Sequence, residues 1–205
     1  MPDPKVIQLH RSGSGSPLIL LPGLDHPAGV WDRLPGLAGR FERVVCDLSG
    51  VIRRDTFEIE DLAEMLAEAL SAERIERGHV VGSGFGGMIA LCLAAAMPMR
   101  VDRMVLCDTS PGLSEDMRET LLTRHGNGPA EAAMARADLL DFAEDVHART
   151  LVLCADGADL AMRDGADFLA RSMPSGQLAF VPGAMSDAIV ERPDWMERVL
   201  LDFLG

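Results

Sequence analysis

The chain has 205 residues, of which 48% are hydrophobic and 25% charged, a composition typical of one soluble globular domain. Its 19 basic and 32 acidic residues give a net charge of −13, which disfavours nucleic acids and anionic membranes as partners. The longest apolar run, Met88–Met97, is too short to cross a bilayer, and the N-terminus lacks the basic and apolar regions of an export signal. We therefore expect a cytoplasmic protein.

Short β-rich segments alternate with longer helical patterns, which is typical of βαβ units and a mainly parallel sheet. Several of the β-rich segments are almost entirely apolar, as expected where helices cover both faces of a sheet. The fold class is therefore α/β, in one domain over residues 1–205. The predicted strands are Val6–His10, Leu18–Leu21, Arg43–Cys46, His79–Val81, Arg103–Cys107, Thr150–Cys154 and Gln177–Val181.

Helical periodicity is clearest over Ile59–Ser71, where apolar residues recur on one face. Thr56 precedes this segment and is placed to cap the helix. Three further helices are predicted over Phe85–Met97, residues 163–172 and Asp194–Leu204.

The segment over residues 110–148 interrupts the alternation with two or three short helices. An insertion after a strand of an α/β sheet commonly covers the ligand crevice, so we expect a short cap; an ordinary crossover connection is the alternative. Its exposed apolar residues could support a homodimer. The residues expected on its inner face are Met117, Leu121, Met134, Leu139, Leu140 and Phe142.

The four cysteines and five histidines give no sign of a metal site or a cofactor. The cysteines sit in apolar segments without a CxxC pair, so we expect reduced thiols that act as small hydrophobic residues.

Five segments of the chain share one further pattern. They are Leu18–Trp31 (LILLPGLDHPAGVW), Asp47–Leu66, Val80–Gly112 (beginning VVGSGFGGM), Arg149–Leu160 (RTLVLCADGADL) and Ala179–Leu204 (beginning AFVPGAMSD). In this order, and along nearly the whole chain, they resemble the α/β-hydrolase family. The resemblance implies an oxyanion loop, a catalytic serine at a tight elbow between a strand and a helix, and an acid and a histidine in later loops. The expected reduced cap lies between the third and fourth of these segments.

The family's elbow pattern, G-x-nucleophile-x-G, matches residues 82–86 (GSGFG) and puts Gly84 at the nucleophile position. Ser83 as the nucleophile would require small residues at Val81 and Phe85, because the turn is so tight that larger side chains would collide. The elbow residue has a positive φ, which costs other residues about 1–3 kcal/mol and costs glycine little. Glycine at position 84 therefore predicts a fold that is more stable and that has lost the reaction of the serine nucleophile.

The resemblance places Ala158 at the acid position, with Asp156 and Asp159 nearby as substitutes after a small loop shift. Ser186 stands at the histidine position, and no histidine follows His147. A serine nucleophile needs an adjacent base, and the base needs an orienting carboxylate. Ordinary serine hydrolysis is therefore the enzymatic mechanism that we favour least.

The oxyanion site implied by the resemblance consists of backbone N–H groups, those of Phe85 and Leu24. Phe85 also opens a helix, whose N-terminus favours an anion or a polarised carbonyl. We therefore expect a retained pocket for a small-molecule ligand, which Leu24, Asp25 and Phe85 help to bind; water on these N–H groups is the alternative.

The remaining polar residues allow displaced chemistry. His26 could act as an acid or base, although we expect a solvent-exposed loop histidine. Asp108 could be a displaced acid or a cap on the turn DTSPG. Ser83 and Ser186 could bind a ligand, but we expect them to fill the vacated space. The sequence shows no basic group arranged to activate the cysteines, so we expect core packing rather than a relay.

Three functions follow. The leading one is a non-hydrolytic protein that binds a small acyl- or carbonyl-containing molecule or acts through a partner. The second is an esterase, lactonase or thioesterase that uses Ser83, Asp108 and His26. The third is a lyase or isomerase in which the oxyanion site works with His26 or Asp25 and no nucleophile is needed.

Overall fold

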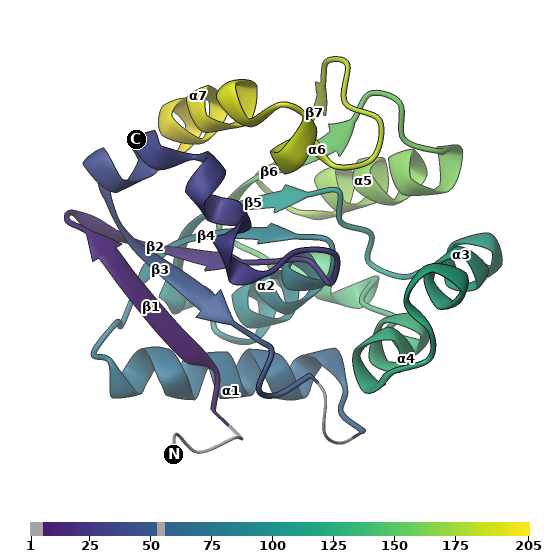
Figure 1. The fold of residues 1–205 in the computed structure, drawn as a ribbon, viewed down its shortest axis with the longest axis horizontal. Helices are drawn as coiled ribbons and strands as arrows, with labels where there is room; N and C mark the ends of the chain where they lie inside the picture. Colours follow the sequence, from purple (N-terminus) through teal and green to yellow (C-terminus); the bar gives the residue numbers. More distant parts are fainter. Residues whose placement is uncertain (1–5, 53–55) are drawn as a thin grey trace.

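The computed structural model describes residues 6–52 and 56–205 and contains a seven-stranded sheet between two layers of helices (Figure 1). The strand order is β1-β3-β2-β4-β5-β6-β7; β1 is antiparallel to β3, and all other neighbours are parallel. The α/β class and the mostly parallel sheet are thus confirmed. The strands are β1 (Gln8–Gly13), β2 (Ser16–Leu21), β3 (Phe41–Asp47), β4 (Gly78–Ser83), β5 (Val101–Cys107), β6 (Arg149–Ala155) and β7 (Gly176–Val181).

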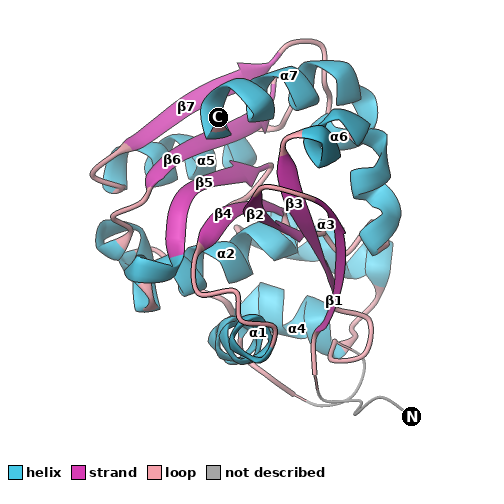
Figure 2. Cartoon of the chain, turned by 90° about the vertical axis from the view of Figure 1, so that its left-hand side faces the viewer, coloured by secondary structure: helices cyan, strands magenta, loops and turns pink. Residues whose placement is uncertain are grey.

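The helices follow the strands in alternation, with additional short turns of 3-10 helix (Figure 2). The α-helices are α1 (Ile59–Ala72), α2 (Phe85–Ala96), α3 (Glu115–His125), α4 (Pro129–Arg136), α5 (Leu160–Ser172), α6 (Ala188–Glu191) and α7 (Pro193–Leu204). The 3-10 helices are η1 (Ala28–Arg33), η2 (Pro35–Gly39), η3 (Pro98–Arg100) and η4 (Asp141–Asp145).

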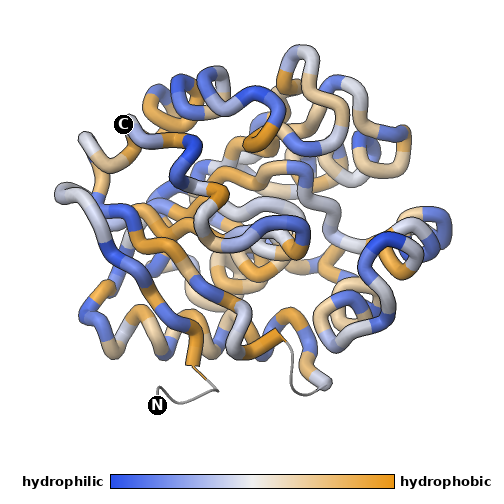
Figure 3. Tube along the Cα trace, in the orientation of Figure 1, coloured by the Kyte–Doolittle hydropathy of each residue, from blue (hydrophilic) through white to orange (hydrophobic). Residues whose placement is uncertain are grey.

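A separate hydrophobic core lies on each face of the sheet. On one face α1 and α2 pack through buried residues such as Leu66 and Ile89. On the other face η1, η2, α6 and α7 pack through residues such as Trp31 and Leu200. The apolar strands run between these layers in Figure 3, with hydrophilic segments at the periphery. Burial on both faces explains why the sequence of the central strands is continuously apolar.

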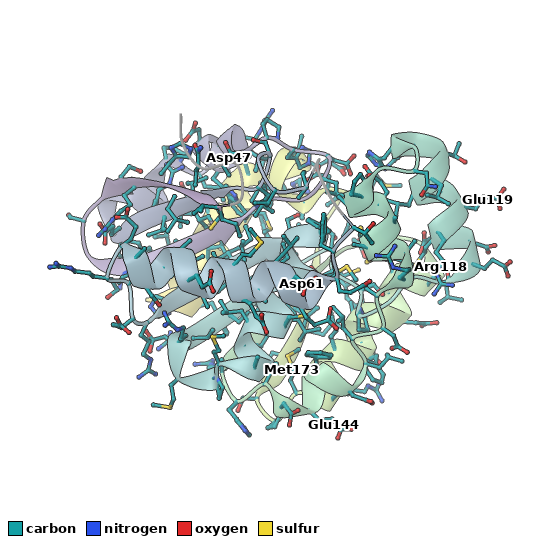
Figure 4. All side chains as sticks on the ribbon, turned by 90° about the horizontal axis from the view of Figure 1, so that it is seen from below. Asp47, Asp61, Arg118, Glu119, Glu144 and Met173 are labelled. Atoms are coloured by element: carbon teal, nitrogen blue, oxygen red, sulfur yellow. The ribbon has the colours of Figure 1, made fainter. Side chains whose placement is uncertain are left out.

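Several local expectations are wrong. The first strand begins at Gln8 rather than Val6 and continues to Gly13. Thr56 does not cap α1: the N-cap residue is Glu58, which directly precedes the helix, and its backbone N–H donates to Asp61 at 2.9 Å. Figure 4 labels Asp61 on α1. Leu140 is 42% exposed, because it lies at the turn before η4 next to the fully buried Leu139.

The segment between β5 and β6 contains α3, α4 and η4, at the right-hand side of Figure 1. It starts where β5 ends and therefore extends from the carboxyl edge of the sheet. Within residues 6–52 and 56–205, the structure contains no helix that is long and apolar enough to span a membrane. Residues 1–5, and three positions of the stretch that resembles the family over Asp47–Leu66, lie outside the described residues.

Candidate functional site

A cavity of about 1080 Å³ lies at the carboxyl ends of the parallel strands, where α/β sheets commonly bind ligands. The loops that follow β2, β4, β5, β6 and β7 all contribute to its walls. The structure brings together nine of the residues that the sequence singled out for the site. These residues are Leu24, Asp25, His26, Ser83, Gly84, Phe85, Asp108, Ala158 and Ser186.

The turn between β4 and α2 has the geometry of a tight elbow. Gly84 stands at its tip with φ 48° and ψ −112°, and its backbone N–H donates to the Cys107 carbonyl oxygen at 2.9 Å. A Cβ atom on Gly82 would lie 2.5 Å from the carbonyl oxygen of Gly86. A Cβ atom on Gly86 would collide with the carbonyl oxygen of Leu21. Positions 82 and 86 therefore require glycine, as expected if the G-x-nucleophile-x-G pattern is centred on residue 84.

Gly84 itself has space around it. The nearest atom to a Cβ placed there is the carbonyl oxygen of Asp108, at 3.9 Å. Packing therefore does not exclude a side chain at this position, and the positive φ is the main cost of adding one. Ser83 is only 8% exposed, beneath Gly23 of the loop that follows β2.

Phe85 begins α2, so its backbone N–H belongs to the first helical turn and has no acceptor within the helix. Leu24 lies in the loop after β2, on the wall of the same cavity. The two N–H groups that the resemblance assigns to an oxyanion site thus come from neighbouring strand ends, because β2 and β4 are paired in the sheet.

Asp108 follows β5 and binds backbone amides. Its Oδ1 accepts from the N–H of Ala155 at 2.8 Å, and its Oδ2 accepts from the N–H of Ala188 at 3.1 Å. Burial raises the pKa of Asp108 from 3.8 to about 6, although these two hydrogen bonds act in the opposite direction. The carboxylate links the end of β5 to the end of β6 and to the start of α6, so its hydrogen bonds differ from those of a cap on the turn DTSPG, one of the two roles considered for it.

His26 is paired with a carboxylate that sequence reasoning missed. Its Nε2 is hydrogen-bonded to Oδ2 of Asp187, and the two side chains are 20% and 25% exposed. The expectation of a solvent-exposed loop histidine is therefore wrong. Asp187 follows Ser186 and caps α6, since its Oδ1 accepts from the N–H of Val190 at 3.2 Å. The pattern SDAIVE could have revealed that cap, but nothing in the sequence links it to His26.

The loop that contains Ser186 is held by Glu191. The carboxylate of Glu191 accepts from the backbone N–H groups of Met185, Ser186 and Asp187 at 2.8–2.9 Å. These three hydrogen bonds lower the pKa of Glu191. Ser186 itself is exposed on the cavity wall.

The carboxylates beside Ala158 have other roles. Asp159 caps α5, because its Oδ1 accepts from the N–H of Met162 at 2.8 Å. Asp156 is exposed and does not line the cavity.

The segment between β5 and β6 forms one side of the cavity, through Met117, Leu121 and Met134. It is tied to the loop after β2 by an ion pair: Nε2 of His125 lies 3.0 Å from Oδ1 of Asp25. From the sequence, His125 has no expected role, whereas Asp25 is expected to help bind the ligand.

The four cysteines are free and buried. Burial raises the pKa of Cys154 to about 11 and that of Cys92 to about 12, and it also raises the pKa values of Cys46 and Cys107. Thiols with such pKa values are poor nucleophiles at neutral pH. Within the described part of the chain, no group of three or more His, Cys, Asp and Glu residues is arranged to hold a metal ion.

Comparisons with known proteins find relatives with similar sequences. The putative carbamate hydrolase RutD of Yersinia enterocolitica is 30% identical over 156 residues, which are 69% of this chain and 56% of that protein. The 2-hydroxymuconate semialdehyde hydrolase of a Pseudomonas species is 34% identical over 143 residues, 65% of this chain and 50% of that protein. The chain thus spans about half the length of these curated relatives.

Solved structures are similar over almost the entire fold. A hydrolase from Pseudomonas aeruginosa gives a TM-score of 0.82 at 22% identity and covers 97% of this chain and 94% of its own. The enol-lactonase from Burkholderia xenovorans gives 0.82 at 18% identity, with coverage of 97% and 96%. A family model described as alpha/beta hydrolase fold matches residues 16–151. The chain therefore belongs to the α/β-hydrolase fold family.

Proposed function

We infer that this chain binds a small acyl- or carbonyl-containing molecule in the cavity and no longer performs serine hydrolysis. The observation that carries the proposal is Gly84, which stands at the elbow tip with a positive φ and has no side chain to attack a carbonyl. Ala158 and Ser186 support it, because neither an alkyl group nor a hydroxyl can replace the acid and the base of a serine triad.

The cavity supports binding of an uncharged ligand. A polarised carbonyl oxygen would be held at the N-terminus of α2, near the N–H of Phe85. Among the described residues of the cavity wall, carboxylates such as Asp25, Asp116 and Asp164 outnumber the arginines, of which Arg124 is one, and disfavour anionic ligands.

The first test is labelling of the unmodified protein with a fluorophosphonate probe, read by intact mass and peptide mapping, with an active serine esterase as the positive control. We expect no adduct on the folded protein. In parallel, neutral esters and ketones should raise the melting temperature without being turned over. A stoichiometric adduct on any serine would overturn the proposal.

Displaced hydrolysis is the second candidate. The pairing of His26 with Asp187 favours it, because a histidine oriented by a carboxylate is the base that such an enzyme needs. The relatives named above as hydrolases point in the same direction. Ser83 would then be the nucleophile and Asp108 an accessory acid, and probe labelling would disappear in the Ser83→Ala and His26→Ala variants.

The proposal includes self-association through the segment between β5 and β6. Leu122 and Leu140 of this segment are 39% and 42% exposed, which leaves apolar area for a second copy of the chain. Light scattering should report a dimer at high protein concentration. A monodisperse monomer would remove this part of the proposal.

A further inference from the structure

The pair formed by His26 and Asp187 is built from two distant parts of the chain. His26 lies in the loop after β2, and Asp187 lies between β7 and α6, 161 positions later. Both side chains are only partly exposed, and both line the cavity. Because Asp187 engages Nε2, Nδ1 is the ring nitrogen that remains available to a ligand.

Asp187 is held in place before any ligand arrives. One of its carboxylate oxygens caps α6 through the N–H of Val190, which leaves the other for His26. Its own backbone N–H donates to Glu191 at 2.9 Å. A carboxylate fixed in this way can set the tautomer and the orientation of the imidazole, which is the role of the carboxylate in a catalytic histidine pair.

The loop that carries His26 lies over the elbow. A Cβ on Gly23, three residues before His26, would lie 3.3 Å from the carbonyl oxygen of Ser83, the residue before Gly84. At the elbow, Gly84 has no side chain and leaves space at the position of the family's nucleophile. The next residue, Phe85, is the first of α2 and presents its backbone N–H there. The cavity therefore combines a histidine–carboxylate pair, an anion-stabilising N–H group and an empty nucleophile position.

We propose that His26 and Asp187 form an acid–base pair that moves a proton at the carbon next to the carbonyl of a neutral ketone with an apolar tail. The proposal rests on the proposed function, because it needs a carbonyl group bound at the elbow.

The step balances without a cofactor or an oxidant. Nδ1 of His26 takes the proton from the α-carbon, and the C–H electron pair becomes the C=C bond of an enolate. The carbonyl π electrons move to oxygen, where the N–H of Phe85 stabilises the negative charge. Asp187 stabilises the imidazolium, which then returns a proton to the carbon and restores the ketone.

The class of substrate follows from the wall of the cavity. Four methionines, Met117, Met134, Met162 and Met185, line it and provide a flexible apolar surface. Leu160 also lines the cavity and is 74% exposed. Among the described residues of the wall, carboxylates outnumber Arg124 and disfavour a substrate that carries a carboxylate or a phosphate.

The test is hydrogen–deuterium exchange of the α-protons of 4-phenylbutan-2-one in D₂O, followed by proton NMR. Its matched anionic probe is 4-(3-oxobutyl)benzoate. The protein should accelerate exchange of the neutral ketone above the buffer rate, and the anionic ketone should exchange far more slowly. His26→Ala should lower the protein-dependent exchange rate by about 100-fold or more, which is the usual scale of general acid–base catalysis.

Asp187→Asn keeps an acceptor for the N–H of Val190 and should lower the rate by about 10-fold to 100-fold, on the scale of other positioning carboxylates. Added imidazole should restore part of the rate to His26→Ala, which a structural role would not allow. His147→Ala is the control, because His147 is exposed outside the cavity and should not affect exchange. Melting temperatures report whether each variant is folded.

Saturation-transfer NMR on the same samples measures binding of the ketone. Binding without accelerated exchange would overturn the acid–base pair and leave the proposed function standing. Exchange that persists in His26→Ala would also overturn the pair. Absence of both binding and exchange with the wild-type protein would overturn the pair and the proposed function together.

Discussion

The backbone N–H of Gly84 donates a hydrogen bond to the carbonyl oxygen of Cys107 at 2.9 Å, and this bond ties the elbow tip to the neighbouring strand end. It holds Gly84 at φ 48°. Gly84→Ser should therefore destabilise the fold by about 1–3 kcal/mol, because serine carries the steric cost of a positive φ. Thermal unfolding should show a melting temperature lower by several degrees.

Two other glycines serve as controls for this substitution. Gly126 has φ 86° and open space around it, so Gly126→Ser should also be destabilised by its backbone conformation alone. Gly39 has equally open space without a positive φ, so Gly39→Ser should be almost neutral. If Gly126→Ser lowers the melting temperature and Gly84→Ser leaves it unchanged or raises it, the steric cost of the positive φ at Gly84 is not the cause.

Asp108 should make the protein more stable in mild acid than at neutral pH. Its pKa is about 6 in the folded chain against an ordinary 3.8, so the folded state binds the proton more tightly. The contribution of Asp108 is fully present below about pH 4 and is lost as the pH rises through about 6. The total change is roughly 3 kcal/mol, from about 1.4 kcal/mol for each pH unit between the two values.

Urea unfolding of the wild-type protein and of Asp108→Asn at pH 4.5 and pH 7.5 measures this change, since the variant does not titrate at position 108. Asp202→Asn, which removes an exposed carboxylate from α7, is the matched control. The stability of the wild type relative to Asp108→Asn should be lower at pH 7.5 than at pH 4.5. A constant difference would show that the pKa of Asp108 is not raised.

Glu191 should control the order of the loop that carries Asp187. A glutamine at this position has one acceptor oxygen in place of two, so Glu191→Gln should lose at least one of the three loop hydrogen bonds. Amide hydrogen exchange at residues 185–187 should become several-fold faster. Glu68→Gln, an exposed change on α1, should leave it unaffected.

In the wild-type protein, acid should likewise reduce the protection of these loop amides, measured as their exchange rate relative to the intrinsic rate at the same pH. Because hydrogen bonding lowers the pKa of Glu191, its contribution is present above the ordinary value and is lost as the pH falls through the lowered one. If the amides of residues 185–187 exchange at the same rate in Glu191→Gln and in the wild type, Glu191 does not hold the loop.

Local sequence patterns predict the fold and the elbow well, because the forces that specify them act over short stretches. Apolar runs mark the strands, and the glycines at 82 and 86 mark a turn that is too tight for side chains at those two positions. The pairing of His26 with Asp187 was missed, since it depends on how two loops 161 positions apart meet above the sheet. The same distance effect hides the contact of Asp108 with Ala188 and that of His125 with Asp25.

Helix α3 should be the most easily opened wall of the cavity. None of its residues is buried, so little apolar packing fixes it, and the ion pair of His125 with Asp25 is its link to the loop after β2. Its amides should exchange faster than those of α2, whose first ten residues are all buried. Asp25→Asn should speed exchange in α3 several-fold while global stability changes by about 0–1 kcal/mol, the usual value of a partly exposed ion pair.

Glu119→Gln provides the comparison on the same helix. Arg118 and Glu119 are exposed on α3, where Figure 4 labels them, and Glu119→Gln removes one charge without touching Asp25. This variant should exchange as the wild type does. If both variants speed α3 equally, the helix is sensitive to its overall charge rather than to the pair. Faster exchange in Asp25→Asn alone would establish that the pair of His125 with Asp25 holds α3 against the loop that carries His26.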